Sequence, residues 1–492
     1  MLQRILVSAA VLFMLISALP QAVCGNDVDI PETASGRMLK ALLESFNSGN
    51  EEAWSEFIAD NWKKSDDPES AQRRLGFFRQ VYGDTRGLEL ENVIDSDELV
   101  ITALLRAKKP VSDIEWVDLT VYIDSNDTDK LLIISARPGE SPDYALPDKK
   151  FSQDEMIEFL DKYIEELAAD DKFSGTVLIA KDGVPFYKKV YGEACKRYNV
   201  PNKLDTKFNL GSMNKMFTGV AIMQLVEQDK ISLDDKVGKY LPDIPNTQIA
   251  EKVTVHHLLT HTSGMQDYWD EMFDTSFWEL KTVDGLASLI FEDSLLFEPG
   301  SDFHYSNSGP IVLGMIIEKV SGISYYDYIK KNIYEPAGMI NSGCFEVDTP
   351  VPNLAIGYTR MNYDGTMLPE EILHNNLFLH AVKGGPAGGG YSTVEDLLAF
   401  DQALRHNKLM SKESFELMST GKTERRPGTS YACLIQDQMV NGHRIVGHGG
   451  GAPGINAMLD MYMNSGYTVA VMANYDGAAS RVADKIREIL TR

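Results

Sequence analysis

The sequence predicts two α+β domains, the larger of which is built on one antiparallel sheet. The chain has 492 residues, more than one ordinary domain holds, since domains average about 100–200 residues. Residues 30–137 show helical periodicity followed by four strand-like runs, which is typical of a small α+β domain. Residues 151–492 begin and end with strands around a helix-rich middle. We therefore expect both ends of this segment to form a central antiparallel sheet flanked by helices.

The composition excludes several classes of protein. A hydrophobic content of 43% with 24% charged residues is typical of a globular protein and excludes a disordered chain, a collagen and a polytopic membrane protein. The 47 basic and 72 acidic residues give a net charge of −25. An acidic chain repels phosphate backbones, so we expect no nucleic-acid partner. The four cysteines form no Cys-x-x-Cys pair, which argues against a disulfide scaffold and a cysteine zinc site.

Residues 1–24 have the pattern of an export signal. Arg4 supplies a short basic region, and the apolar run Ile5–Leu19 is short for a bilayer span. The tripeptide Ala22–Cys24 then resembles a small-x-small cleavage site. The sequence therefore predicts a periplasmic or secreted protein with no stable membrane span after cleavage. Two alternatives stay open, an uncleaved N-terminal anchor and a lipid anchor on Cys24.

The N-terminal domain is predicted to combine two helices with a run of strands. Apolar residues at helical spacing mark helices over residues 33–48 and 51–62. Four strand-like runs follow, separated by polar turns: Leu88–Ile94, Leu99–Arg106, Ile114–Ile123 and Lys130–Ile134. The segment Leu42–Asn50, Leu-Leu-Glu-Ser-Phe-Asn-Ser-Gly-Asn, resembles the opening of nuclear-transport-factor-2-like domains. The resemblance implies a domain of that family over residues 30–137.

A linker over residues 138–150 is predicted to separate the two domains. Three prolines punctuate this polar stretch, which shows no periodicity. The large domain, residues 151–492, then begins with a helix, for which Ser152 and Glu155 have the spacing of a capping box. Its predicted strands lie near both ends of the domain, over residues 175–180, 185–191, 444–447, 455–463 and 468–474.

One motif with catalytic chemistry lies early in the large domain. Ser212 and Lys215 form a Ser-x-x-Lys pair after Gly211, at the start of a predicted helix. Residues i and i+3 of a helix share a face, with Cβ atoms about 5–6 Å apart. A lysine of lowered pKa can take the proton of a serine, and a helix N-terminus favours the negative charge that develops. The pair therefore predicts nucleophilic catalysis by Ser212.

Other motif matches favour structural roles. Ser419 and Lys422 repeat the Ser-x-x-Lys spacing, but Gly421 lies between them, and a helix end is the better interpretation. Residues 449–454 match the dinucleotide pattern Gly-x-Gly-x-x-Gly, but a predicted strand follows them, whereas that motif requires a helix. The chain contains neither Gly-x-Ser-x-Gly nor His-Glu-x-x-His. The three histidines within residues 256–261 are interpreted as a helix and its following turn rather than as a metal site.

Two further motifs follow Ser212 in the order of a known family. Tyr305-Ser306-Asn307 lies just before a helical run at 311–320, and His448-Gly449-Gly450 follows a predicted strand near the C-terminus. Together the three motifs resemble the active site of serine β-lactamases and penicillin-binding proteins. The Tyr-x-Asn form is similar to the class C branch, with its esterase and D-amino-acid peptidase relatives. The resemblance covers residues 170–490 and implies the β-lactamase/transpeptidase-like fold.

The resemblance also implies a role for each residue of the first two motifs. Ser212 would attack a carbonyl carbon and form an acyl-enzyme. Lys215 would take the hydroxyl proton or polarise the pair, and Tyr305 would pass the proton to the leaving group. Asn307 would hold Lys215 and the amide or ester oxygen of the substrate.

The third motif departs from the lactamase pattern in one residue. His448 stands where β-lactamases that bind a substrate carboxylate usually carry lysine, and Lys383, before a glycine-rich loop, is a competing candidate. The glycines Gly449, Gly450 and Gly451 are expected to bind substrate, with the oxyanion between the backbone N–H groups of Ser212 and Gly451. An unperturbed histidine pKa of about 6.5 leaves His448 mostly uncharged at neutral pH, which favours an esterase or peptidase over a strong β-lactamase.

The sequence thus predicts an exported serine hydrolase that acts through an acyl-enzyme on an ester or amide. Esterase and D-amino-acid peptidase or carboxypeptidase activity both fit, with weak β-lactamase activity beside them. The competing hypothesis is a penicillin-recognising or partner-binding protein that is acylated without efficient turnover. All the catalytic residue types are present, which favours the enzyme. The expected partner is a small-molecule or peptide substrate, and no metal or organic cofactor is implied.

Overall fold

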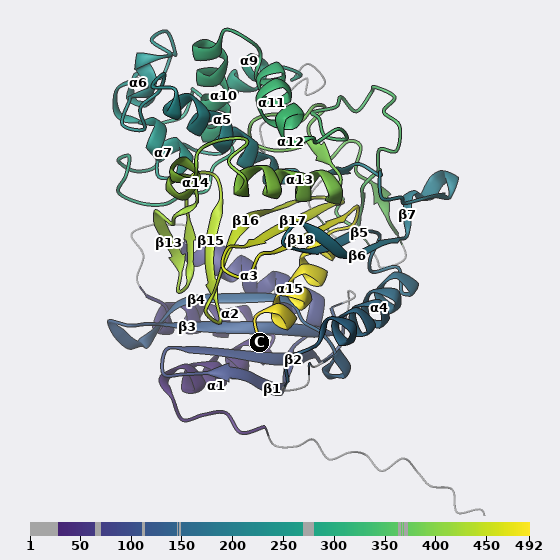
Figure 1. The fold of residues 1–492 in the computed structure, drawn as a ribbon. Helices are drawn as coiled ribbons and strands as arrows, with labels where there is room; N and C mark the ends of the chain where they lie inside the picture. The colour runs from purple at the N-terminus through teal and green to yellow at the C-terminus, as the bar shows by residue number, and fades with distance from the viewer. Residues whose placement is uncertain are drawn as a thin grey trace, which may run out of the picture. The chain divides into compact units, whose positions relative to one another are not determined.

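The chain divides into two compact units between residues 145 and 146, within the segment predicted as a linker (Figure 1). The computed structural model describes residues 28–63, 70–110, 114–144, 146, 149–268, 280–362, 366, 368 and 372–492. The predicted export signal, residues 1–24, lies outside the described residues. Within them, no helix has the length and apolar character needed to cross a membrane.

The N-terminal unit packs helices against a four-stranded antiparallel sheet whose strands pair in sequence order. Its elements are α1 (Ala34–Asn47), α2 (Glu51–Asn61), α3 (Ser70–Thr85), β1 (Leu88–Ser96), β2 (Val100–Ala107), β3 (Trp116–Asp124) and β4 (Asp127–Pro138). Helix and sheet side chains, among them Leu39, Trp54, Phe78 and Val121, are buried in a core of this unit. All of these elements except α3 are predicted by the sequence. The resemblance to nuclear-transport-factor-2-like domains stays a prediction.

The larger unit is organised by an antiparallel sheet to which both ends of the unit contribute. The described strands of this sheet follow the order β13-β14-β15-β16-β17-β18-β5-β6. Their bounds are β5 (Gly175–Lys181), β6 (Val184–Tyr191), β13 (Thr423–Arg426), β14 (Thr429–Tyr431), β15 (Gln436–Val440), β16 (His443–Ala452), β17 (Ile455–Tyr462) and β18 (Tyr467–Ala473). Strand β5 pairs with β18, from Gly175 opposite Ala473 to Lys181 opposite Tyr467. The predicted fold class is therefore confirmed.

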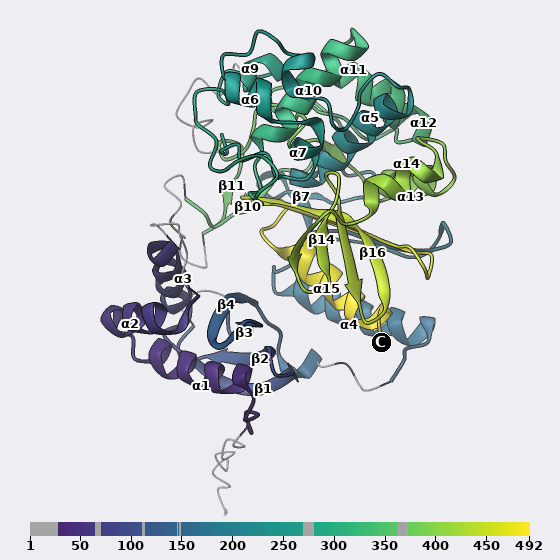
Figure 2. The ribbon, with the colours of Figure 1, turned by 90° about the vertical axis from the view of Figure 1, so that its left-hand side faces the viewer.

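Helices cover both faces of this sheet. Figure 2 shows α4 (Gln153–Ala169) and α15 (Ala478–Leu490) on one face, and α13 (Val394–Arg405) with α14 (Lys412–Ser419) on the other. A helical region continues beyond α13: α5 (Lys215–Glu227), α6 (Thr247–Lys252), α7 (Val255–Leu259), α9 (Val283–Ala287), α10 (Ser308–Ser321), α11 (Tyr325–Ile329) and α12 (Glu335–Ala337). Short strands complete the unit: β7 (Glu193–Cys195), β8 (Val200–Pro201), β9 (Phe208–Asn209), β10 (Tyr358–Thr359), β11 (His374–Asn375) and β12 (Tyr391–Ser392). The predicted capping box is present at the start of α4.

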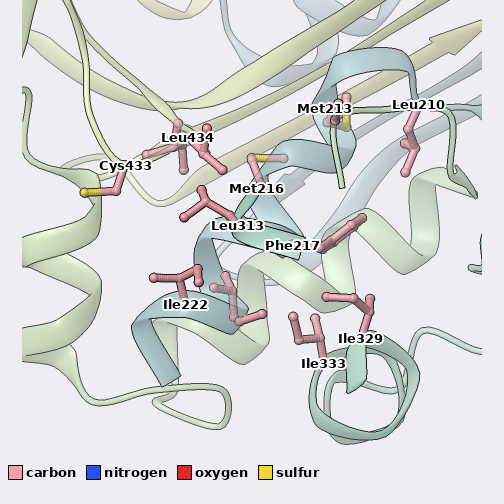
Figure 3. Close-up of a cluster of buried hydrophobic side chains, with 14 of the residues drawn as sticks. Leu210, Met213, Met216, Phe217, Ile222, Leu313, Ile329, Ile333, Cys433 and Leu434 are labelled. Atoms are coloured by element: carbon pink, nitrogen blue, oxygen red, sulfur yellow. The ribbon is translucent and has the colours of Figure 1, made fainter. Parts of the chain in front are cut away.

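Helix α5 lies at the centre of the larger unit's core. Its residues from Lys215 to Leu225 are all buried, because the helix is apolar on nearly every side. Figure 3 shows Met216, Phe217 and Ile222 of this helix among side chains from α10, α11 and the segment after β14. The Phe217 ring also meets the Phe400 ring of α13, with 4.9 Å between centroids. This close packing holds the N-terminus of α5, and with it Ser212, in a fixed place.

Candidate active site

Ser212 lies on a short 3₁₀ helix, Gly211–Asn214, that leads directly into α5. Gly211 has a φ of +50°, and a Cβ there would lie 2.8 Å from the backbone nitrogen of Gly451, so the turn needs glycine. The Asn209 side chain accepts a hydrogen bond from the Gly211 N–H at 2.9 Å. The sequence predicts Ser212 and Lys215 on one α-helix, whereas the structure places Ser212 in the tighter turn before it. The two side chains still meet, with 3.1 Å between Lys215 Nζ and Ser212 Oγ.

The Lys215 side chain is fully buried and bonded on three sides. Besides Ser212, its Nζ donates to Asn307 Oδ1 at 2.7 Å and to the backbone oxygen of Ala387 at 2.5 Å. Both of these oxygens only accept, so they occupy two N–H groups, whereas the Ser212 hydroxyl can either donate or accept. A neutral Lys215 amine would therefore direct its lone pair at the Ser212 hydroxyl. This geometry suits the transfer of the serine proton.

Asn307 and Tyr305 approach Lys215 from the start of α10. The Asn307 side-chain NH₂ donates to Asp267 Oδ2 at 2.9 Å, which directs the amide oxygen of Asn307 towards Lys215. The Tyr305 ring centroid lies 4.9 Å from Lys215 Nζ, and Tyr305 lines the same cavity as Ser212. Asp267 is not predicted by the sequence. Its signal is weak, because a lone aspartate in a loop matches no motif.

The glycine-rich segment 384–390 forms another wall of the site. Its backbone holds the nucleophile turn: the Gly385 oxygen accepts from Asn214 Nδ2 at 2.7 Å, and the Gly389 N–H donates to the Gly211 oxygen at 3.1 Å. Together with the Ala387 oxygen on Lys215, these bonds leave little room for side chains. The sequence identifies this segment as a glycine-rich loop next to Lys383. The segment contributes backbone atoms to the site, and no pattern of residue types in the sequence predicts such a contribution.

Strand β16 runs through the third motif and packs against the Ser212 turn. A Cβ at Gly450 would lie 1.8 Å from the Leu210 oxygen and 3.0 Å from the Ser212 nitrogen, so only glycine allows this approach. The sequence places the glycines after a strand that ends at residue 447, whereas β16 continues to Ala452. Pairing with β17, from Ile445 opposite Tyr462 to Ala452 opposite Ile455, keeps the glycines extended.

A cavity of about 430 Å³ opens over the nucleophile. Of the predicted site residues, Ser212, Tyr305, Asn307 and Gly451 line it. The backbone N–H groups proposed for the oxyanion, those of Ser212 and Gly451, therefore border one space, although their role stays a prediction. The cavity also has apolar walls, contributed by Tyr268, Leu286, Ile311, Ala381 and Ile455, and two charged groups, Asp267 and Lys383.

His448 is not among the residues that line the cavity, and its side chain is buried. The ring is 4% exposed, its Nε2 lies 3.0 Å from the Tyr431 hydroxyl oxygen, and its Nδ1 bonds the Gly449 carbonyl. Burial, reinforced by the nearby Lys215, lowers the pKa of His448 to about 4. The expectation of a neutral ring at neutral pH thus holds over a wider range than the unperturbed pKa implies. That His448 meets substrate stays a prediction, and its buried ring weighs against it.

Lys383, the competing candidate for the third motif, does line the cavity. Its Nζ lies 3.2 Å from Glu346 Oε1 and 4.1 Å from the centroid of the Tyr326 ring. Glu346 also pairs with Lys281 at 2.8 Å. Lys383 therefore has a carboxylate partner before any substrate enters, and it shares that partner with Lys281.

The structural interpretations of the other motifs are confirmed. Ser419 is the last residue of α14, and the glycine run of β16 is followed by strand β17 rather than a helix. Two of the clustered histidines lie on α7, and His261 follows in a turn with φ +55°. His261 also contacts a residue of the candidate active site. Its ring packs on Tyr305, with 4.4 Å between centroids.

Serine, lysine, tyrosine and asparagine around one cavity define an acyl-transfer site of the kind expected from the three motifs. A sequence profile of the beta-lactamase family matches residues 160–491. The chain belongs to the beta-lactamase family, and it is a serine hydrolase that acts by acyl transfer. The match begins after the N-terminal unit, which leaves that unit outside the family domain.

Similar proteins agree with this membership. Penicillin-binding protein 4* of Bacillus subtilis (strain 168) is 32% identical over 350 residues, which are 66% of this chain and 75% of that protein. The crystal structure of a penicillin-binding protein from Bacillus halodurans matches with a TM-score of 0.61 and 32% identity, over 66% of this chain and 99% of that one. A D-stereospecific amidohydrolase from Streptomyces sp. matches with a TM-score of 0.57 and 25% identity, over 67% of this chain and 97% of that one.

Proposed function

We propose that the protein is an exported serine hydrolase that cleaves uncharged esters and amides, among them D-amino-acid amides, through an acyl-enzyme on Ser212. One observation carries this proposal: Ser212 Oγ lies 3.1 Å from the buried Nζ of Lys215 at the wall of a cavity. A serine next to an amine in a closed setting is the arrangement that makes a hydroxyl nucleophilic. Export is supported by the pattern of residues 1–24.

In the proposed reaction, Lys215 acts first as a base, and Tyr305 then carries the proton to the leaving group. Lys215 takes the Ser212 proton as Oγ attacks the carbonyl carbon, and the backbone N–H groups of Ser212 and Gly451 stabilise the oxyanion. The proton then passes by way of Tyr305 to the leaving alcohol or amine, and the C–O or C–N bond breaks. In the second half, water attacks the acyl carbon and the bond to Ser212 Oγ breaks. One proton of the water passes to Oγ, and the carboxylic acid is released. Asn307 keeps Lys215 in place through both halves.

The charges around the cavity support a preference for substrates without a carboxylate. His448 is neutral, Lys383 is paired with Glu346, and the Asp267 carboxylate faces the same space. An anionic substrate would meet the Asp267 carboxylate, whereas Lys383 already has a carboxylate partner and the Lys215 amine is buried among oxygen acceptors. The name of the D-stereospecific amidohydrolase supports a D-amino-acid amide as one substrate class, because such a molecule is uncharged or cationic.

A substrate panel tests this proposal. With the purified protein, we expect a p-nitrophenyl ester and a D-alanine p-nitroanilide to be turned over faster than nitrocefin and faster than a succinylated, anionic ester of matched length. The ratio of kcat/KM for the neutral over the anionic ester should be on the order of 10 to 100, since one charged contact is worth about 1.5–3 kcal/mol. A preference for the anionic ester or for nitrocefin would contradict the proposal.

The second candidate function is a penicillin-recognising protein that is acylated without turnover. The names of the Bacillus relatives favour it. The same panel separates the candidates, because this alternative gives one equivalent of p-nitrophenol as a burst and no steady state. A fluorophosphonate probe should label the protein in both cases, so the discriminating measurement is the rate after the burst.

Activity should reside in the larger unit alone. Residues 150–492 contain all the proposed catalytic groups, and the unit has its own core, distinct from that of the N-terminal unit. We expect this fragment, without residues 26–140, to fold and to hydrolyse the p-nitrophenyl ester within about threefold of the full chain. Near-ultraviolet circular dichroism verifies folding. A folded but inactive fragment would show that the N-terminal unit contributes to the site, and the proposed domain division would be wrong.

A further inference from the structure

A line of buried hydrogen bonds connects the second and third motifs without passing through the nucleophile. It begins at the backbone N–H of Ser306, which lies 3.3 Å from His261 Nδ1. His261 Nε2 lies 3.1 Å from the Tyr431 hydroxyl oxygen, and the same oxygen lies 3.0 Å from His448 Nε2. His448 Nδ1 then bonds the Gly449 carbonyl. The three side chains are between 1% and 4% exposed.

The two ends of this line fix the direction of every bond in it. A backbone N–H only donates, so His261 Nδ1 must accept from Ser306, and a neutral His261 carries its proton on Nε2. A backbone carbonyl only accepts, so His448 Nδ1 must donate to Gly449, and a neutral His448 has a free lone pair on Nε2. Between the two rings, His448 Nε2 is the acceptor left for the hydroxyl proton of Tyr431. The hydroxyl accepts from His261 Nε2–H and donates to His448 Nε2.

We propose that His448 is a positioning residue, held neutral as the acceptor of the Tyr431 hydroxyl. Together with His261 and Tyr431, it holds the Tyr305–Asn307 segment and the β16 glycines in fixed positions relative to each other. All the donors and acceptors along the line match when both rings are neutral. A second proton on His448 would put two N–H groups on the Tyr431 oxygen and leave the Tyr431 proton without its acceptor. The line therefore disfavours the imidazolium by hydrogen-bond counting, in addition to burial.

The two backbone segments at the ends of this line carry or border the groups that take part in the proposed reaction. Ser306 lies between Tyr305 and Asn307, and the Tyr305 ring packs on His261. At the other end, Gly449 precedes Gly450, whose close approach to Leu210 and Ser212 sets the distance between β16 and the nucleophile turn. A shift of either ring would move a backbone segment that borders the cavity. Misplacement of about 1 Å can cost on the order of 10²-fold in rate.

The charges around the line act in the same direction. Lys215 faces both rings from α5 and lowers the pKa of each, and burial is the larger cause in both cases. For His261, the other groups that lower its pKa are His448 on β16, Arg425 on β13 and His304 before α10. Only the Gly449 carbonyl raises the pKa of His448. No acidic side chain is among the groups that shift either ring, which is consistent with two neutral imidazoles.

The experiment is nuclear magnetic resonance of the full chain labelled with ¹⁵N-histidine, with His261→Gln and His448→Gln used to assign the two rings. We expect His261 to carry its proton on Nε2 and His448 to carry its proton on Nδ1, with neither ring titrating between pH 5.5 and 8. In Tyr431→Phe, the neutral form of His448 loses its donor, so the midpoint of its titration should rise by about 0.5–1 pH unit. The kcat of ester hydrolysis at pH 7 should fall about tenfold, with KM changed much less.

Tyr334→Phe is the matched control. Among the described residues the Tyr334 hydroxyl is buried without a hydrogen-bond partner, so its removal deletes the same atom from the core but breaks no bond. It should leave both histidine signals and kcat unchanged. A His448 proton on Nε2 or a His448 imidazolium at pH 7 in the unmodified protein would overturn the proposal, even if Tyr431→Phe does not fold. The proposal would also fail if Tyr431→Phe and Tyr334→Phe gave the same His448 titration. The histidine resonances do not depend on which substrate the enzyme uses, whereas the kcat readout rests on the proposed function.

Discussion

Ser212→Ala is expected to abolish acyl-enzyme formation and to lower the kcat of ester hydrolysis by on the order of 10⁴-fold or more, the scale found when a serine nucleophile is removed. Ser212 is the serine whose hydroxyl lies 3.1 Å from Lys215 Nζ at the wall of the cavity. The measurement is labelling by a fluorophosphonate probe, followed by mass spectrometry of the peptide that carries residue 212. The mass increase should be present in the unmodified protein and absent in the variant.

Ser419→Ala provides the control for this result. Ser419 belongs to the second Ser-x-x-Lys of the chain, but it ends α14 and its hydroxyl lies 3.4 Å from an Arg444 guanidinium nitrogen. Its removal should leave labelling and kcat as they are in the unmodified protein. An acyl group found on Ser306 or Ser419 would contradict the assignment of the nucleophile. Ser306 is the sharper alternative, since it lies next to Tyr305.

The elements that the sequence predicts most clearly have a continuous apolar run or a short local motif. Strands β5, β17 and β18 are buried along most of their length, and their apolar runs mark them clearly. The capping box of α4 is visible because both partners are within four residues of each other. By contrast, α3 has only Phe78 and Thr85 fully buried among 16 residues, so its apolar period is too weak to predict a helix. Strand β13 is mostly exposed and polar, with the same consequence.

In the candidate site, the sequence predicts side chains that belong to motifs but not groups that act through the backbone. Ser212, Lys215, Tyr305 and Asn307 are found from the sequence because their residue types and order match a family pattern, and the structure brings all four together. Groups that act through the backbone, such as the Ala387 oxygen on Lys215, have no such pattern. The limits of β16 are also missed, since three consecutive glycines usually indicate a loop. In this protein they form a strand because they pair with β17, and Gly450 must be glycine because the Leu210 backbone passes too close for a side chain.

His448 shows how tertiary structure changes what is expected of a residue that a motif singles out. From its position in the motif, the residue is expected to meet substrate, and its unperturbed pKa predicts a change of charge near pH 6.5. Burial behind the glycines lowers that pKa to about 4, and Tyr431 occupies the ring nitrogen that a substrate would need. Tyr431 lies 17 residues before His448 in the chain. Nothing in the sequence indicates that the two side chains meet.

Lys215→Met is expected to slow acylation of Ser212 by on the order of 10³-fold, because a positioned base contributes about 10²–10⁴-fold and the variant keeps the serine but not the amine. The variant should fold, with a free energy of unfolding lowered by about 1–3 kcal/mol, since Asn307 Oδ1 and the Ala387 oxygen each lose a donor. The apolar side chain fits the same buried path and removes the cost of desolvating an amine, which limits the loss. Urea denaturation measures the stability, and stopped-flow labelling with the fluorophosphonate measures the chemical step.

Lys422→Met is the matched control, because Lys422 is the exposed lysine of the second Ser-x-x-Lys and its backbone N–H bond to the Tyr431 oxygen does not involve its side chain. It should change neither the labelling rate nor the stability by a measurable amount. The two results for Lys215→Met separate its roles, because a lysine that only fills space would lower stability and leave the labelling rate of the folded fraction intact. If the folded Lys215→Met protein is labelled within tenfold of the unmodified rate, Lys215 is not the base. The proton of Ser212 would then have to leave by way of another group at the cavity, and Tyr305, whose ring lies beside Lys215, is the first candidate.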